Sequence, residues 1–484
     1  MIVNNQILLG KANEEDVYLS VKMLNRHGLI TGASGTGKTV TLKGIAEGLS
    51  NLGVPTFIAD IKGDLTGMIT DGNLSSIQSR VDALQLKDFT TSSFPVHFFD
   101  VFRQSGCPIR TSVEAIEPSY LSRILSLTDA QEGILHIVYE CANDLDLDLI
   151  DLDDLQAMLE YVGEHAKELT NKYGAVSKQS VGGIQRKLLQ LKSQNGQLMF
   201  GMPELDIQDL LMTKNGKGVM NILECEELVQ NPMLYSTFML WMLNAIEDSL
   251  EEVGDLEKPR MVFFFDEAHL LFENTSKELV SKITQLIKLI RSKGVGIIFC
   301  SQSPMDIPDE VLGQLSNRIQ HSLRAYTPSE LKDVKAISQS FRENPAFDTF
   351  EAITSLKTGE AIVSCLDEEG IPSIAQRTMI VPPQSSMKAS SSDTIHQQIN
   401  QDSFYQKYKD DIDPESAYEK LQKISEEKKE LELHEKQLKE EKEVKKQQQK
   451  QQTRIARKIT NRIENEVMNF GVRSAKKFLK GLLK

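Results

Sequence analysis

The sequence lacks the cysteine and histidine patterns that hold metals or disulfide frameworks. Its five cysteines include no Cys-x-x-Cys pair, which argues against a zinc ribbon and against a set of structural disulfides. Cys225, Cys300 and Cys365 lie in apolar runs, so we expect buried thiols in a reducing compartment. The eight histidines are scattered without metal-ligand spacing.

The sequence also lacks an apolar segment of membrane length. The first residues, MIVNNQILLGKANEED, do not combine a basic region with a long apolar stretch, so they do not predict a signal peptide. The most apolar runs, MVFFF and VGIIFC, are of strand length and far too short to span a bilayer. We therefore expect a cytoplasmic protein that is not transmembrane.

Basic residues are outnumbered over the chain as a whole, with 55 Lys and Arg against 69 Asp and Glu. The formal net charge is −14 and the isoelectric point about 5.2. This balance argues against a protein coated with cations for nucleic acid, but it leaves room for a local basic segment.

Changes of pattern along the 484 residues predict an α/β core with an insertion and a tail. Residues 1–110 contain strand-like runs around one helical run, which indicates a βαβ unit and hence a parallel sheet. Residues 111–210 have apolar residues at helical spacing and predict a helical insertion. Strand-like runs return over 211–384, where short connections favour an antiparallel end of the sheet. A polar, Ser-rich linker is expected over 385–415, and a charged helical tail over 416–484.

The stretch HGLITGASGTGKTVTL (27–42) matches G-x-x-x-x-G-K-[ST] at every fixed position. A strand-like run precedes the match and a helical run follows it, as this phosphate-binding motif requires. Glycines let the backbone wrap around phosphate oxygens, and the helix N-terminus adds positive potential. Lys38 would reach the β- and γ-phosphates, and the hydroxyl of Thr39 would ligate Mg²⁺. The predicted nucleotide-binding residues of this loop are Gly32, Ala33, Ser34, Gly35, Thr36, Gly37, Lys38 and Thr39.

A pair of acids follows the apolar strand of RMVFFFDEAH (260–269). Asp266 is predicted to hold Mg²⁺ through water, and Glu267 to orient or deprotonate the attacking water. An acid pair after a strand is a weak signal alone, but it is strong beside a phosphate loop. The second acid favours a hydrolytic ATP motor over a switch GTPase.

Two further segments supply polar side chains at predicted strand ends. GVGIIFCSQSP ends its strand at Gln302, which could touch the γ-phosphate or the lytic water. IADIKGDL offers Asp60, Lys62 and Asp64 after another strand. These three could lie near the γ-phosphate, at a subunit border or in a solvated turn, and Asp60 is predicted to contribute to nucleotide binding.

These motifs together resemble the HerA/FtsK branch of P-loop ATPases. The resemblance rests on GASGTGKT, IADIKGDL, FFFDEAHLLF and CSQSPMDIPDEVLGQLSNRIQHSLRAYTP. The sequence is most similar to a bacterial subfamily of that branch, the YjgR-like proteins, whose helical stretch resembles LTDAQEGILHIVYE and DLDDLQAMLEYV. The similarity covers roughly residues 1–384.

The resemblance implies a RecA-like P-loop NTPase core of the ASCE type, with the sensor strand between the P-loop strand and the Walker B strand. It implies ATP with Mg²⁺, and a ring, usually a hexamer, with active sites between subunits. A ring of this kind needs an arginine supplied in trans. Arg318 is the first choice for that arginine and Arg324 the alternative. About 26 residues precede His27, enough for a β-hairpin.

The tail has two differently charged halves. Over 416–450 an incomplete a/d seam of Leu421, Ile424, Leu431 and Leu438 is interrupted by charges, so a coiled coil and a solvated single helix both remain open. The last stretch predicts a basic amphipathic helix, which can bind nucleic acid, an anionic membrane surface or a protein partner. A helix docked on its own ring is the other interpretation. Its cations are Arg454, Arg457, Lys458, Arg462, Arg473, Lys476, Lys477, Lys480 and Lys484.

The sequence thus predicts a cytoplasmic, ring-forming ATPase that couples ATP hydrolysis to movement of a polymer, with DNA favoured. One alternative is an ATP-switched assembly or signalling scaffold that recruits a partner through its tail. Another is an ATPase that remodels proteins.

Overall fold

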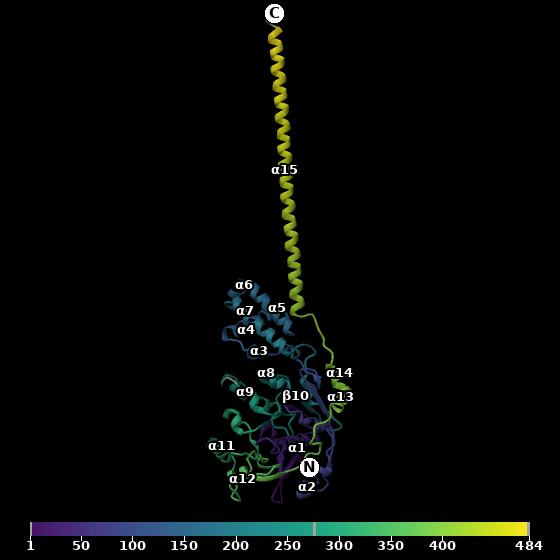
Figure 1. Ribbon diagram of the computed structural model, residues 1–484, viewed down its shortest axis with the longest axis vertical. Coiled ribbons are helices and arrows are strands. Elements are labelled where there is room, and N and C mark those ends of the chain that lie inside the picture. The colour runs from purple at the N-terminus through teal and green to yellow at the C-terminus, as the bar shows by residue number, and fades with distance from the viewer. Residues whose placement is uncertain (1, 274–276, 482–484) are drawn as a thin grey trace. The chain divides into compact units, whose positions relative to one another are not determined.

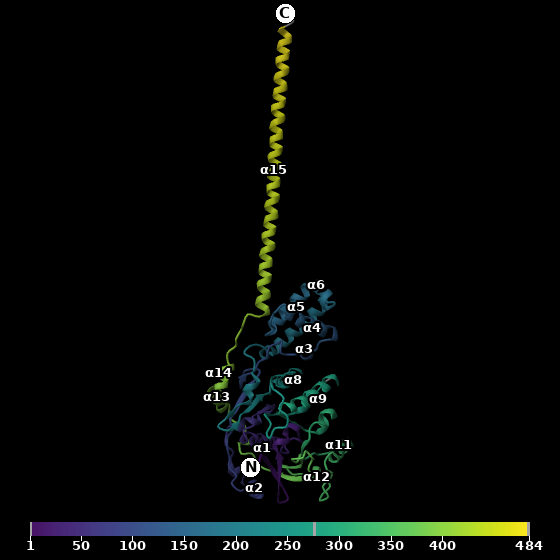
Figure 2. The ribbon, with the colours of Figure 1, turned by 180° about the vertical axis from the view of Figure 1, so that it is seen from behind.

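The protein is described by a computed structural model that covers residues 2–273 and 277–481 (Figures 1 and 2). The chain divides into two units, one that ends at Ala417 and one that begins at Tyr418. The first unit contains all strands and all helices except the last, and the second is a single helix.

A mixed β-sheet forms the centre of the first unit. Eight neighbouring strands of this sheet are parallel, as expected for an α/β core. The strand before the phosphate loop, β4, is separated from the strand before the acid pair, β11, by β12. The predicted order of P-loop, sensor and Walker B strands is therefore confirmed. In spatial order the parallel strands are β13 (Asn317–His321), β4 (Gly28–Thr31), β12 (Val295–Ser301), β11 (Met261–Phe265), β5 (Thr56–Asp60), β10 (Met220–Glu224), β6 (Val96–Asp100) and β7 (Cys107–Pro108).

Beyond β13 the sheet becomes antiparallel, as the short connections predicted. The expected N-terminal hairpin joins this end of the sheet, with β2 paired to both its hairpin partner and β15. A separate small hairpin consists of β8 (Thr213–Lys214) and β9 (Lys217–Gly218). The strands of the antiparallel end are β14 (Glu360–Ser364), β15 (Gln376–Ile380), β2 (Gln6–Ala12), β3 (Glu15–Ser20) and β1 (Ile2–Val3).

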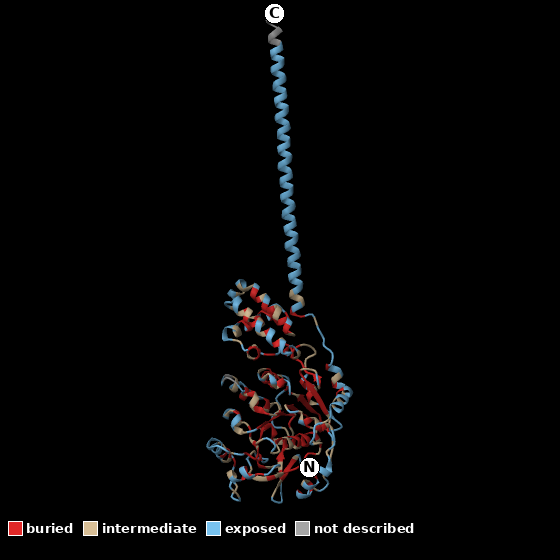
Figure 3. Ribbon diagram, viewed as in Figure 1, coloured by how far each residue is buried: buried red, intermediate tan, exposed pale blue. Residues whose placement is uncertain are grey.

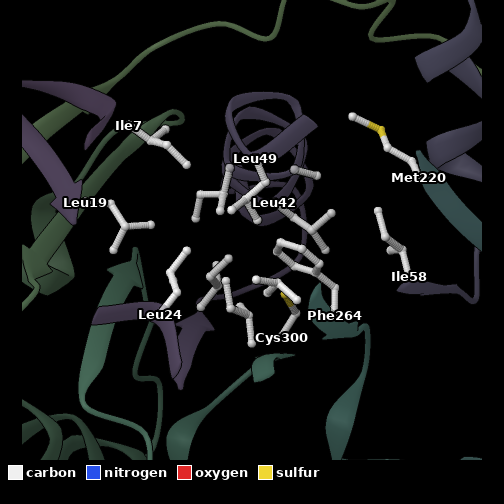
Figure 4. Close-up of a cluster of buried hydrophobic side chains, with 14 of the residues drawn as sticks. Ile7, Leu19, Leu24, Leu42, Leu49, Ile58, Met220, Phe264 and Cys300 are labelled. Carbon is white, nitrogen blue, oxygen red and sulfur yellow. The ribbon is translucent and has the colours of Figure 1, made fainter. Parts of the chain in front are cut away.

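The hydrophobic core lies between the sheet and the helix that follows the phosphate loop, α1 (Lys38–Asn51) (Figure 4). Side chains alternate between the two faces of a strand. Val262 and Phe264 of β11 belong to the cluster that includes Leu42 and Leu49 of α1. The next residues along the strand face the other way, where Phe263 stacks on Phe57 and Phe265 meets Phe299 edge-on. Burial on both faces explains why β11 is an uninterrupted apolar run.

Five helices lie between β7 and β10, in the region predicted as a helical insertion. Their apolar faces pack together, so that Leu135, Leu155 and Ile184 are fully buried. The carboxylate of Asp151 accepts hydrogen bonds from the first-turn N–H groups of its helix, which fixes where that helix begins. These helices are α3 (Pro118–Ile124), α4 (Asp129–Asp144), α5 (Leu152–Glu164), α6 (Ala166–Tyr173) and α7 (Lys178–Ser193).

The other helices of the first unit connect or cover strands. The apolar helix α8 (Pro232–Ser249), which leads to β11, is buried along most of its length. The helix α9 (Lys277–Ser292), which leads to β12, packs on α8 and on β12. The remaining helices of this group are α2 (Leu74–Ala83), α10 (Asp309–Leu312), α11 (Pro328–Gln339) and α12 (Thr349–Ser355).

The segment 385–415 was predicted to be a polar linker, and this prediction is wrong. The segment contains α13 (Ser392–Gln401) and α14 (Ser403–Tyr408) and is packed against the core. Ile399, Phe404 and Tyr408 of this segment are buried, whereas Met387 and Ile412 are exposed. We call residues 384–417 the C-terminal strap. A polar composition misled the prediction because much of the strap docks through its backbone.

The contact between the strap and α1 shows this backbone docking. Glu47 is fully buried, and its carboxylate accepts hydrogen bonds from the backbone N–H of Gln384 (2.6 Å) and of Ser385 (3.0 Å). A methyl group on Gly67 would lie 2.3 Å from the carbonyl oxygen of Lys388. The strap therefore passes so close to residue 67 that only glycine fits there.

The second unit is one continuous helix, α15 (Ala417–Gly481, with Ala417 in the first unit), and its described residues after Leu421 are exposed (Figure 3). A coiled coil would need a second chain, so the coiled coil and the solvated single helix both stay predictions. The side chains of Lys480 and Lys484, counted among the tail cations, lie outside the described residues. Within the described part of the chain, no helix combines the length and the apolar character needed to cross a membrane.

Candidate nucleotide-binding site

The phosphate-binding motif forms the turn between β4 and α1, at the carboxyl edge of the parallel strands. Gly37 has φ +119° and precedes the first residue of α1. A Cβ atom on Gly32 would lie 2.4 Å from Cβ of His321, so no side chain fits there. Gly37 therefore allows a left-handed backbone, and Gly32 allows a close approach to β13.

Hydrogen bonds fix this loop to three neighbouring segments. The N–H of Gly32 donates to the carbonyl of Gln302 (3.2 Å), and the N–H of Ala33 donates to the carbonyl of Ser322 (2.9 Å). The carbonyl of Thr36 accepts a hydrogen bond from the N–H of Gly359 (2.9 Å). The loop is therefore held in place by the ends of β12 and β13 and by the turn before β14.

Lys38 is almost completely buried although it carries a charge. Its Nζ donates hydrogen bonds to the carbonyl oxygens of Gly32 (2.6 Å) and Ala33 (3.3 Å), so the side chain curls over the loop. Burial lowers the pKa of the Lys38 ammonium from its ordinary value, while the charge of Glu267 favours the protonated form. The ammonium thus lies at the loop's centre, held by weak carbonyl partners that a phosphate can replace.

The acid pair follows β11 directly. Glu267 is 6% exposed and adopts φ +44°, a left-handed conformation that is rare for a residue with a long side chain. Such backbone strain clusters at functional sites. Oε1 of Glu267 accepts a hydrogen bond from Nζ of Lys62 at 2.8 Å. Oε2 is buried and has no hydrogen-bond partner among the described residues.

Electrostatics separate the two acids. Burial raises the pKa of Asp266 above its ordinary value. Burial would do the same to Glu267, but the hydrogen bond and charge of Lys62, together with Lys38, bring its pKa below the ordinary value. Glu267 is therefore a carboxylate at neutral pH.

Asp60 ends β5, next to the acid pair, but its carboxylate is already engaged. It accepts hydrogen bonds from the backbone N–H of Lys62 (3.3 Å) and of Leu65 (2.9 Å). Burial, with the nearby charge of Asp266, raises the pKa of Asp60 to about 6. The structure brings Asp60 beside the acids and uses it to shape the following loop, so its role in nucleotide binding stays a prediction.

Gln302 and Arg324 lie beside the phosphate loop in one cleft of about 700 Å³. Both side chains are exposed, and Ala33 of the loop contributes to the same cleft. The wall opposite is partly apolar, with Leu323 and Val334. Gln302 thus lies beside the phosphate loop, and its role as a sensor of the nucleotide stays a prediction.

Arg318 lies elsewhere. It pairs with Leu29 on the neighbouring β4, upstream of the phosphate loop, and its guanidinium donates to the carbonyls of Leu315 and Leu312, each at 3.3 Å. The structure does not bring Arg318 into its own chain's site, whereas Arg324 lines the cleft there. Both arginines remain predictions for a role in trans.

Comparison with known proteins adds the family. The chain matches the family model described as Helicase HerA-like C-terminal over residues 5–481. The chain belongs to this family. The predicted HerA/FtsK-type resemblance is therefore confirmed, while the YjgR-like subfamily stays a prediction.

One relative of this HerA-like chain is the DNA double-strand break repair helicase HerA of Sulfolobus acidocaldarius, 24% identical over 366 residues. The match covers 74% of this chain and 66% of the relative, so the chain spans just under two thirds of the relative's length.

Two solved structures share the fold of the HerA-like chain. The plasmid coupling protein TrwB in complex with ADP and Mg²⁺ has a TM-score of 0.52 at 15% identity, covering 80% of this chain and 92% of TrwB. VirB4 of Thermoanaerobacter pseudethanolicus has a TM-score of 0.51 at 15% identity, covering 79% of this chain and 99% of VirB4. These likenesses support the predicted RecA-like α/β core.

Two residues of the HerA-like site were not among the predicted site residues. Lys62 was expected near the γ-phosphate, at a subunit border or in a solvated turn, without a role of its own. His321 is buried behind the loop, where its Nδ1 faces the carbonyl of Glu360 (3.0 Å) and its Nε2 accepts from Thr41 Oγ1 (2.9 Å). Burial lowers the pKa of His321 to about 4, so the ring is neutral. In the sequence, His321 could have been noticed as a polar residue at the end of a predicted strand.

Proposed function

We propose that the chain is a ring-forming ATPase of the HerA type that couples ATP hydrolysis to movement along DNA. The observation that carries the proposal is the placement of a phosphate loop, an acid pair and Gln302 at the carboxyl edge of three adjacent strands. A relative named as a DNA repair helicase supports DNA as the polymer.

The residues present fit a magnesium nucleotide. No side chain caps the N-terminus of α1, so its first N–H groups face the inside of the loop. Oε2 of Glu267 is buried without a hydrogen-bond partner among the described residues, as a group that binds water would be. A structure with the same fold, TrwB, is titled as a complex with ADP and Mg²⁺.

Each residue has a distinct task in this proposal. Lys38 and the N–H groups of the loop bind the β- and γ-phosphates, while Thr39 and, through water, Asp266 hold Mg²⁺. Mg²⁺ neutralises negative charge on the phosphates when bound. Glu267 orients the attacking water and accepts its proton. Gln302 contacts the γ-phosphate or that water.

In the proposed ring, a hexamer in particular, each subunit supplies an arginine to the site of its neighbour. Arg318 of one subunit is proposed to act on the ATP of the next, with Arg324 as the alternative. A cytoplasmic location also belongs to the proposal, supported by five buried, unpaired thiols.

The described end of the tail is proposed to bind the DNA that the ring moves. Residues 453–477 contain seven cations and two acids, all exposed. A membrane surface or a protein partner would account for the same charge. The relative's name gives no support to the scaffold and protein-remodelling alternatives.

The test is steady-state ATP turnover of the whole chain, with and without duplex DNA, at several salt concentrations. We expect DNA to stimulate turnover, and the stimulation to fall steeply with salt. Turnover that is indifferent to DNA at low salt would leave an ATPase with another substrate. Mass measurement in solution, with a hexamer expected, checks the ring.

A further inference from the structure

Lys62 makes a contact that the proposed chemistry does not use. It lies between β5 and a 3₁₀ turn, η2 (Asp64–Ile69), and its side chain is 46% exposed. Its ammonium reaches Oε1 of Glu267 at 2.8 Å, across 205 positions of sequence. The carboxylate proposed to activate water is thus bound by a cation from another strand end.

The backbone around Lys62 is fixed on both sides. Asp60 accepts hydrogen bonds from the N–H groups of Lys62 and Leu65, which closes the turn, and Gly63 has φ +69°. Further along η2, the C-terminal strap covers Gly67. The side chain of Lys62 is therefore the part of this loop that can change partner, since its flexible four-carbon stem is half in solvent.

Lys62 does little to hold Glu267 in place. The backbone of Glu267 is buried and left-handed, and Oε2 accepts no hydrogen bond among the described residues, with Nδ1 of His269 at 3.5 Å. The side chain of Lys62 is 46% exposed, so solvent screens its attraction to Glu267, whose side chain is 8% exposed. The contact has small value as a structural bond.

Lys62 shares its electrostatic surroundings with Lys38 of the phosphate loop. Lys62 and Lys38 both interact electrostatically with Asp266 and Glu267. An anion bound by Lys38 beside the acid pair would therefore lie in the field of both cations. Lys38 is proposed to bind the β- and γ-phosphates, and of these the γ-phosphate is the one that the water beside Glu267 attacks.

We propose that Lys62 is a positioning residue with two alternative partners, the carboxylate of Glu267 and the terminal phosphate of the bound nucleotide. The Lys62 ammonium stays hydrogen-bonded to Glu267 until a triphosphate is bound. It then binds the terminal phosphate instead, and Glu267 can accept a proton from water. A diphosphate leaves the Lys62–Glu267 pair intact. This inference rests on the proposed ATPase function.

The test measures binding alone. In a Glu267→Gln background, which blocks cleavage, we compare the Kd of ATP and of ADP with and without Lys62→Met by calorimetry. We expect Lys62→Met to weaken ATP about tenfold, as loss of a charged contact to phosphate does, and to change ADP by less than about twofold. If Lys62 only neutralised Glu267, its removal would have no effect once residue 267 is glutamine, and the proposal would be overturned.

Two further variants make the result specific. Lys62→Arg in the same background should keep the preference for ATP, because a guanidinium can also reach phosphate. Lys22→Met, which removes a surface ion pair to Glu257 of similar length, should leave both affinities unchanged. Equal loss of ATP and ADP affinity with Lys62→Met would assign Lys62 a general role in folding or binding and contradict the inference.

The Glu267→Gln variant, without a change at Lys62, separates this inference from the proposed function. If Glu267→Gln binds neither nucleotide, the proposed function is wrong and the role of Lys62 falls with it. If Glu267→Gln binds both ATP and ADP, and Lys62→Met leaves the ratio of the two Kd values unchanged, the inference alone is wrong.

Discussion

The core sheet and the helix α15 contain similar apolar residues in opposite surroundings. Every residue of β11 is fully buried, whereas Ile455, Ile459, Ile463, Val467 and Phe470 of α15 are 52–77% exposed. In the core, packing fixes the side chains of Lys38 and Glu267, which are 8% and 6% exposed. In α15 the apolar stripe and the described cations are exposed. The residues of the core site indicate its chemistry directly. The surface of α15 does not identify its partner, which must be found by experiment.

The largest expected effect is at the centre of the core site. Lys38→Ala removes the only buried ammonium of the phosphate loop, so ATP hydrolysis should fall by at least about 10²- to 10³-fold. Replacing a tail cation, Arg457→Ala, should leave turnover without DNA unchanged. A colorimetric phosphate assay on both variants measures this contrast, and turnover retained by Lys38→Ala would refute the assignment of the phosphate loop.

Apolar truncation compares the two regions directly. Ile58→Ala removes a fully buried side chain and should lower the free energy of unfolding by about 2–5 kcal/mol. Ile463→Ala, at a position that is 57% exposed, should change it by less than about 0.5 kcal/mol. Urea denaturation followed by circular dichroism gives both values. An equally large loss at Ile463 would mean that the assembled protein buries the stripe.

The strap offers a third comparison, between two glycines near α1. Gly67→Ala places a methyl group 2.3 Å from the carbonyl of Lys388, so the strap must shift, at a cost of about 1–3 kcal/mol. Gly44→Ala, inside α1 with nothing within 4 Å of the new methyl group, should be neutral or stabilising by up to about 1 kcal/mol. Limited proteolysis should release residues after the strap faster in the first variant only. Equal rates would mean that the strap is not held at Gly67.

The smallest effect is expected from charge removal in α15. Changing Arg454, Lys458 and Arg462 to glutamine should make the slope of log affinity for duplex DNA against log salt shallower by about 2 to 3. The same change at Lys436, Lys439 and Lys446, in the half with balanced charge, serves as the control. Fluorescence anisotropy over a salt series measures both slopes. Identical slopes would remove DNA as the partner of the basic stretch.

Local motifs carried most of what the sequence could predict. The phosphate loop and the Asp266–Glu267 pair are contiguous in sequence, and their chemistry follows from residue type and from the strands that precede them. The parallel order of β4, β12 and β11 came from the family resemblance and is confirmed. Which arginine acts between subunits is a question about a second chain, so one sequence gives only candidates.

The remaining features depend on contacts between distant positions. The pair of Lys62 and Glu267, and that of His321 and Thr41, join positions more than 200 residues apart. The strap has the composition of a linker, yet buried Glu47 binds its backbone. Backbone hydrogen bonds leave no mark in composition, and only the folded chain shows them.

The central claim is that this site cleaves ATP with Glu267 as the group that activates water. The most direct measurement incubates Glu267→Gln with ATP and Mg²⁺, isolates the protein and identifies the nucleotide that it retains. The account predicts bound ATP, with cleavage slowed by about 10²- to 10⁴-fold relative to the unmodified chain. Bound ADP formed at the unmodified rate would contradict it and would assign the proton transfer to another residue.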